Sequence, residues 1–270
     1  MPFTLSHAAA ALPFRRLKPV WPALVIGTFA PDIQYFIWIS DEDRSGHHFP
    51  QILFLTLPLA LLVLWLFEKL VKRPAVELLS EGVQRRLQDK LAPLAFTGWK
   101  QFGSIVLWIA IGILTHIVWD QFTHPRTRMV ELFPVLATWI SVPLLHSMQI
   151  SKLLQHISTV LGIVGLAIWF AAWYRRTTPV PHSRIQPFPV SLRSALIAGM
   201  SLAALLIGYP LAIWRLEDHE GPIKTIFLVV TVFEAVTLIF CIALLVYGAA
   251  STLNARLRHL PAAQLDESGG

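Results

Sequence analysis

Long apolar stretches alternate along the chain with short connections that carry most of the charge. Crossing a bilayer takes about 20 residues of helix, and six stretches are apolar over roughly that length. They cover roughly residues 20–39, 49–68, 103–121, 154–174, 193–214 and 223–248. The pattern predicts an all-α fold, a polytopic transmembrane helical bundle of about six spans.

A seventh apolar stretch, residues 131–147, is only marginally long enough to span and contains Pro134 and Pro143. The distribution of Lys and Arg decides its interpretation, because cytoplasmic connections carry an excess of both. Six spans with a cytoplasmic N-terminus place 16 of the 22 Lys and Arg residues inside. A span over 131–147 would instead move the four arginines of 175–193 outside. We therefore expect a re-entrant or interfacial helix there, and both termini in the cytoplasm.

The composition favours an integral membrane protein, since 55% of the 270 residues are hydrophobic and only 14% are charged. Soluble domains carry about 25% charged residues. The formal net charge of +6 raises the question of a nucleic-acid partner, but the basic residues lie in the connections between apolar stretches. Membrane topology explains this placement. We expect membrane lipids and no nucleic acid as partners, and the sequence leaves the oligomeric state open.

The chain divides by where its polar motifs lie. Residues 1–174 carry the motifs described below and are expected to form one membrane domain, 175–260 supply two further transmembrane helices, and 261–270 form a polar tail. The 69–102 connection has the pattern of an amphipathic helix at the cytoplasmic surface. The single cysteine, Cys241, excludes a thiolate metal cluster and is interpreted as a packing residue.

The most informative polar residues are His116, Asp120 and His124, in the segment T-H-I-V-W-D-Q-F-T-H-P. Four-residue spacing turns a helix by about 400°, so the three side chains form one stripe. Ionisable groups at membrane depth are costly and indicate a site by default. Taken alone, His116 and Asp120 could simply pair inside a bundle. His124, which precedes a proline at the expected helix end, is either a third ligand or an interfacial residue.

A second group of polar residues comes earlier in the chain. Prolines bracket the segment F-R-R-L-K, so residues 4–12 and 20–31 are expected to form two short helical legs of a hairpin. A hairpin returns the chain to its starting level, which brings His7 and Asp32 together at the open end. The adjacent His47 and His48 are alternatives for one further position.

We expect these groups to converge on one divalent metal ion in the outer half of the membrane. Imidazole and carboxylate suit a borderline cation, and zinc is the ion they favour. Asp32 or Asp120 is expected to be catalytic, either as a metal ligand or as the acceptor of the water proton. The expected metal ligands are His7, Asp32, His47, His48, His116, Asp120 and His124.

The motifs also occur in a familiar order. An early S-H-A-A-A-A-L-P is followed by V-I-G-T-F-A-P-D, S-G-H-H-F and G-I-L-T-H-I-V-W-D-Q-F-T-H. This order resembles bacterial membrane-bound metal-dependent hydrolases, although those often carry H-R-G where this chain reads D-R-S-G-H-H. The opening P-F-T-L-S-H and the later L-L-Q-H-I-S-T-V-L-G look more closely like the domain of unknown function 4184 family. The resemblance covers about residues 1–165, implies site roles for His7, Asp32, His116 and Asp120, and implies a bacterial inner membrane protein.

Two classes of function follow from these observations. The first is an integral membrane metal-dependent hydrolase acting on a lipid-linked ester or phosphodiester, in which the metal activates water. The second is non-enzymatic: an ion- or proton-coupled transporter, to which Glu234 in the last apolar stretch would contribute, or a scaffold whose polar groups fix helix packing. Inverted repeats, which many transporters have, are not evident in the sequence.

Overall fold

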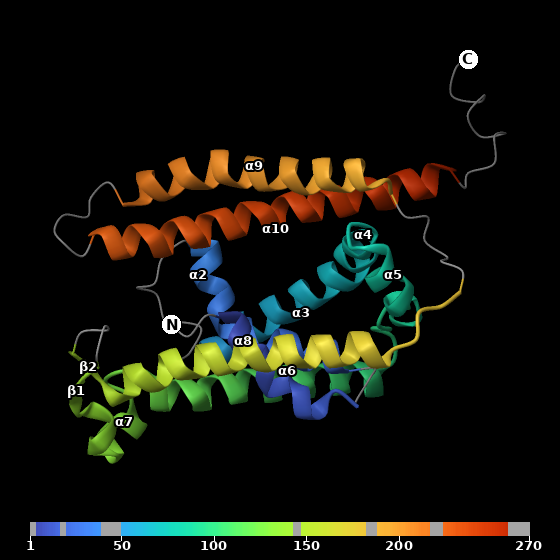
Figure 1. The fold of residues 1–270 in the computed structure, drawn as a ribbon. Helices are drawn as coiled ribbons and strands as arrows, with labels where there is room; N and C mark the ends of the chain where they lie inside the picture. The colour runs from blue at the N-terminus through green and yellow to red at the C-terminus, as the bar shows by residue number, and fades with distance from the viewer. Residues whose placement is uncertain are drawn as a thin grey trace. The chain divides into compact units, whose positions relative to one another are not determined.

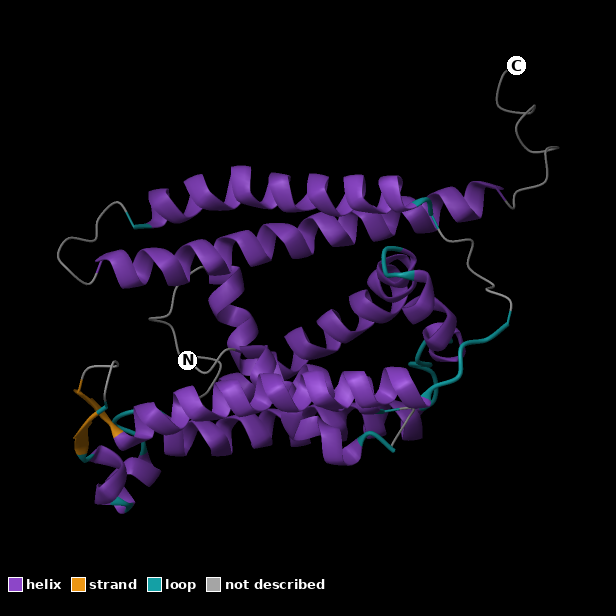
Figure 2. Ribbon diagram, viewed as in Figure 1, coloured by secondary structure: helices purple, strands orange, loops and turns teal. Residues whose placement is uncertain are grey.

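The computed structural model describes residues 4–16, 20–38, 50–142, 147–181, 188–216 and 224–258. These residues are almost entirely helical (Figures 1 and 2), with one short two-stranded sheet. Among them, five helices are long and apolar enough to cross a membrane. The fold class, an all-α polytopic bundle, is therefore confirmed. The five candidates are Ile52–Glu77, α6 (Trp99–Thr123), α8 (Ile150–Arg176), α9 (Val190–Arg215) and Leu228–Asn254 within α10 (Lys224–Arg258).

The first of these candidates, Ile52–Glu77, is a composite helix. Two π-helical turns interrupt its regular hydrogen bonding and divide it into four consecutive pieces. They are η4 (Ile52–Thr56, π), α3 (Leu57–Leu66), η5 (Phe67–Val71, π) and α4 (Lys72–Glu77).

The stretch predicted as the first span, 20–39, is not one long helix. It forms α1 (Trp21–Phe29), a 3₁₀ turn η2 (Ala30–Asp32) and α2 (Ile33–Trp38). The backbone leaves the helical conformation at Phe29, and Pro31 lacks the N–H that would continue the helical hydrogen bonds. The preceding residues form η1, a 3₁₀ helix over Thr4–Phe14. The two short helical legs predicted for the N-terminal region are thus present.

The 131–147 region was predicted to be a helix, and this is correct only for its first part. Here α7 (Arg128–Leu132) and η7 (Pro134–Ala137) are followed by β1 (Trp139–Ser141), which pairs antiparallel with β2 (Ser147–Gln149). Aromatic and β-branched residues favour strands, and Trp139 and Ile140 stand in β1. The apolar content of 131–147 therefore did not distinguish a helix from the strand that begins at Trp139.

The chain folds as two compact units. The first comprises residues 1–64 and 94–177, and the second comprises 65–93 and 178–270. In the second unit α9 and α10 pack together, and α10 also packs on η5 and α4. The amphipathic segment predicted within 69–102 contains α5 (Glu81–Leu87) and η6 (Gln88–Lys90). The predicted polar tail, 261–270, lies outside the described residues.

The first unit is built on a close crossing of α1 and α6. A Cβ on Gly112 would lie 2.5 Å from the carbonyl oxygen of Leu24, and a Cβ on Gly27 would collide with the carbonyl oxygen of Ile109. Small residues allow backbones to approach closely in membrane helix pairs. A buried apolar cluster fills the same unit beside this crossing, and it includes Ala23, Ile26, Leu64, Ile105, Ile109 and Ile113. The crossing fixes the α1 backbone directly against the middle of α6.

Candidate metal centre

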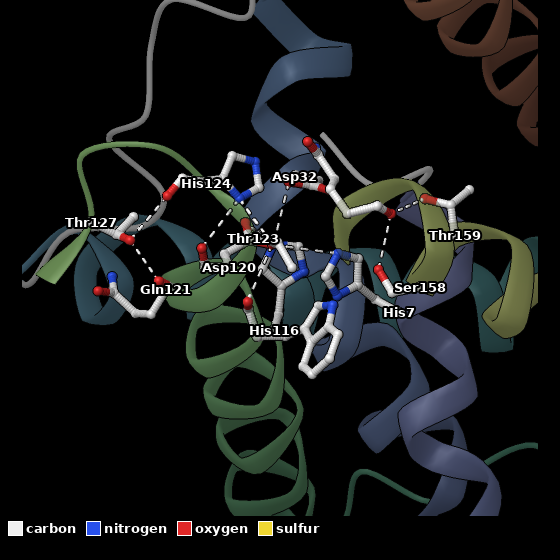
Figure 3. Close-up of polar contacts among 12 residues, drawn as sticks. His7, Asp32, His116, Asp120, Gln121, Thr123, His124, Thr127, Ser158 and Thr159 are labelled. Atoms are coloured by element: carbon white, nitrogen blue, oxygen red, sulfur yellow. Dashed lines mark hydrogen bonds and ion pairs between the residues drawn. The ribbon is translucent and has the colours of Figure 1, made fainter. Parts of the chain in front are cut away.

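Three elements of the first unit bring four His and Asp side chains together (Figure 3). His116 and Asp120 stand one turn apart on α6, Asp32 ends η2, and His7 lies in the second turn of η1. All four residues are buried. The break at Pro31 ends α1 just before Asp32, so the carboxylate lies at the end of one short helix rather than inside a long one.

His116 is at the centre of the group. Its Nε2 lies 3.4 Å from Oδ1 of Asp32 and 3.3 Å from Oδ2 of Asp120. The His7 ring stacks on the His116 ring, with centroids 3.9 Å apart and an interplanar angle of 20°. Nε2 of His7 lies 3.8 Å from Oδ1 of Asp120. Two imidazoles and two carboxylates thus face one small volume.

The opposite nitrogen of His116 determines which atom faces the carboxylates. Nδ1 lies 2.8 Å from the carbonyl oxygen of Thr28. A carbonyl can only accept, so Nδ1 carries the hydrogen and donates it. If the ring is neutral, Nε2 carries a lone pair that faces two carboxylates, and a cation between them is needed to stabilise the arrangement. If no cation is bound, the ring has to be a doubly protonated imidazolium that donates to the carboxylates. An N–H donated to a backbone carbonyl is also the usual support of a metal-binding histidine.

His7 brings a second buried imidazole to the cluster. Its Nε2 makes no hydrogen bond to any described residue, although it lies close to the Asp120 carboxylate. A buried imidazole nitrogen of this kind, in its neutral form, is suited to bind a metal ion.

The distances fit a small divalent cation. One ligand atom each from His7, His116 and Asp120 lie within 4.8 Å of one another. Bonds of about 2.0–2.1 Å to a tetrahedral ion place two ligand atoms about 3.3 Å apart. The contacts of His116 with Asp32 and Asp120 are already at this separation, and that of His7 with Asp120 is 0.5 Å longer. Only a small inward movement of His7 is needed.

His124 lies beside the cluster and contacts Asp120. Its Nδ1 is 3.5 Å from Oδ1 of Asp120 and is also in contact with the Asp120 carbonyl oxygen and Thr123 Oγ1. Because its Nδ1 is engaged in these contacts, His124 is suited to orient the Asp120 carboxylate. Thr127 closes the helix end by donating to the carbonyl oxygens of Gln121 and His124. The two remaining candidates, His47 and His48, lie outside the described residues.

Sequence reasoning did not identify two contributors to this geometry. The carbonyl of Thr28 sets the His116 tautomer, and the Gly27–Gly112 crossing holds that carbonyl in place. Every residue has a backbone carbonyl, so the residue type at position 28 does not indicate that its carbonyl accepts this hydrogen bond. The glycines did offer a signal, since small residues on apolar helices often mark close crossings.

The fold and this cluster define an all-α polytopic membrane protein with buried His and Asp side chains grouped in one unit. The chain belongs to the family described as Domain of unknown function (DUF4184), which matches residues 1–249. The match extends through α9 and most of α10, well beyond the 1–165 that the motifs covered. No curated protein and no solved structure matches the chain.

Proposed function

We propose that the protein is an integral membrane hydrolase whose His and Asp cluster binds one divalent metal ion, zinc by the nature of its donors. The observation that carries the proposal is the environment of His116 Nε2, which faces two carboxylates while Nδ1 donates to Thr28. A bound cation neutralises the like charges and uses the lone pair. It would also explain why four ionisable side chains are buried together at a cost of several kcal/mol each if unpaired.

The geometry favours different roles for the two carboxylates. Asp120 faces both His7 and His116, so these three residues would hold the ion. Asp32 lies against His116 Nε2 and is nearly fully buried, which suits a proton acceptor for an attacking water. When bound, the metal would polarise the substrate oxygen and lower the pKa of the water. The proposed substrate is a lipid-linked ester or phosphodiester, because the cluster lies in an apolar helical unit.

The proposal makes separate predictions for the two carboxylates. Asp120→Asn should lose the metal, whereas Asp32→Asn should retain it and lose turnover by about 100-fold or more, as expected for a missing general base. The measurements are bound zinc per chain and release of headgroup or acyl product from a panel of lipid esters and phosphodiesters. Turnover that survives both a strong chelator and Asp120→Asn would refute a metal-dependent mechanism.

The orientation in the membrane is part of the same proposal. Asp120 lies at the opposite end of α6 from Trp99, which follows the basic 69–98 connection. If this connection is cytoplasmic, the cluster lies in the outer half of the membrane. In that orientation, Thr4 would lie near the outer end of α6 because His7 is beside Asp120, which differs from the cytoplasmic N-terminus that the sequence favoured. The C-terminus would be cytoplasmic, as the sequence predicted.

Cysteine labelling tests the orientation. In a Cys241→Ser background, Asp89→Cys and Leu260→Cys should react with a membrane-impermeant maleimide only after the cells are opened. Glu131→Cys, which lies between α6 and α8, should react in intact cells. The positive-inside distribution of Lys and Arg is the physical reason. Labelling of Asp89→Cys in intact cells would invert the topology and move the cluster to the cytoplasmic side.

A proton- or ion-coupled transporter is the second candidate. The observation in its favour is Glu234, whose residue is only 2% exposed within the α10 helix. Buried carboxylates in membrane helices are typical of proton and ion pathways. This reading is supported over the hydrolase if proteoliposomes show ion flux that Glu234→Gln abolishes while the purified protein contains no bound metal.

A further inference from the structure

Two polar side chains of α8 are buried on the face that packs against the metal-binding elements. Ser151 is 0% exposed and Gln155, one turn later, is 1% exposed. Gly162 follows two turns after Gln155, so it lies on the same face of the helix. A Cβ on Gly162 would lie 2.8 Å from the Ser6 side chain, next to His7 in η1. This face of α8 is therefore directed at the element that carries His7.

The position along α8 matches the level of the cluster. Helices α6 and α8 pack together and are joined through α7 and the β hairpin at one end (Figure 1). Gln155 lies five residues, or about 8 Å, from the start of α8. His116 and Asp120 lie seven and three residues, or about 10 Å and 5 Å, from the end of α6. Gln155 is thus at the depth of the two α6 residues.

The local contacts of Gln155 agree with this placement. Ser158 Oγ and Thr159 Oγ1 donate to its carbonyl oxygen at 3.0 Å and 2.9 Å. Figure 3 shows both hydroxyl residues on the same side of the cluster as His7. These bonds use only the backbone of Gln155, so its side-chain amide is left available.

Neither the amide of Gln155 nor the hydroxyl of Ser151 makes a hydrogen bond to any described residue. A buried polar group without a partner destabilises a protein, and replacing it with an apolar residue would cost little. Two such groups, one turn apart and facing the metal-binding elements, indicate a ligand that supplies the missing acceptor. Both groups can donate a hydrogen, which points to an oxygen atom of that ligand.

We propose that Gln155 Nε2 and Ser151 Oγ form an oxyanion-binding subsite beside the metal centre. The inference rests on the proposed hydrolase function and deepens it. For an ester, the water oxygen bonds to the carbonyl carbon, the C=O π pair moves onto the carbonyl oxygen, and the water proton passes to Asp32. Collapse breaks the bond to the alcohol oxygen, which takes that proton. Gln155 and Ser151 donate to the oxygen that carries the negative charge, as amide and hydroxyl donors do in other hydrolases.

The test uses protein loaded with Co²⁺, whose visible absorption reports ligands that bind beside the metal. Inorganic phosphate represents the phosphodiester and a long-chain trifluoromethyl ketone, which hydrates, represents the tetrahedral ester intermediate. The wild type should bind at least one of the two probes. Gln155→Leu and Ser151→Ala should each lower the affinity for that probe by about tenfold or more. Their affinity for Co²⁺ should match that of the wild type. Gln149→Leu is the matched control, because its amide already donates to the Ala137 carbonyl at 3.3 Å.

The outcomes separate this inference from the proposed function. Probe affinity equal to that of the wild type in both variants overturns the subsite and leaves the metal centre intact. Loss of Co²⁺ from Ser151→Ala, which removes a single hydroxyl, shows instead that this face supports the fold. A wild type that binds Co²⁺ but neither probe also overturns the subsite. A wild type that binds no Co²⁺ refutes the proposed function itself.

Discussion

His116→Ala should reduce the affinity for zinc by more than about 100-fold, since changes to the outer partners of a ligand alone cost about 10- to 100-fold. The substitution removes a nitrogen that contacts both carboxylates. It also leaves Asp32 and Asp120 facing each other across the space of the lost ring, so the carboxylates repel each other. The measurement is a competition titration of the purified protein against a chromophoric zinc chelator.

His156→Ala is the matched control for this prediction. His156 is also a histidine of the first unit, but it lies exposed on α8. Its removal should leave zinc affinity unchanged. Equal zinc affinity in the wild type and in His116→Ala would show that the ion, if bound at all, is bound elsewhere, and that His116 only forms ion pairs.

Gly112→Val should lower the free energy of unfolding by about 3 kcal/mol and also release bound metal. A Cβ at this position lies 2.5 Å from the Leu24 carbonyl oxygen and 2.7 Å from backbone atoms of Gly27, so α1 must move away from α6. The carbonyl of Thr28, which follows Gly27 directly, moves with it and loses its bond to His116. Stability is read from unfolding in mixed detergent micelles, and zinc from elemental analysis of the same samples.

Gly103→Val separates this effect from helix propensity. Gly103 lies on the same helix, and a Cβ there would meet nothing within 4 Å. The change should alter stability by less than about 1 kcal/mol and leave zinc bound. If Gly112→Val behaves like Gly103→Val, the close crossing does not support the cluster.

Local patterns predicted much of the fold and part of the cluster. The four-residue spacing placed His116 and Asp120 on one face, and the prolines around F-R-R-L-K predicted the two short helical legs. Both signals act within one or two helical turns, where sequence spacing converts directly into geometry. The apolar content of 20–39 was misleading, because hydropathy counts residues without regard to the proline that divides them.

The backbone contacts that hold the cluster in place were beyond such reasoning. The crossing of Gly27 with Gly112 joins residues far apart in sequence, and neither glycine indicates its partner. The β hairpin was missed because Trp139 and Ile140 are equally compatible with a membrane-facing helix by hydropathy. The sequence shows Gln155 as a polar residue within an apolar stretch. Only the packing of α8 on η1 shows that its face of the helix is directed at the element that carries His7.

The His and carboxylate side chains of this cluster are proposed to bind one divalent ion. The most direct test is zinc-edge X-ray absorption of the wild-type protein, loaded with zinc after mild purification and freed of excess metal. We expect about one zinc per chain, coordinated only by nitrogen and oxygen at about 2.0–2.1 Å, with an imidazole signature that His116→Ala weakens. A wild type that retains no zinc, or a spectrum unchanged by His116→Ala, would contradict the proposal.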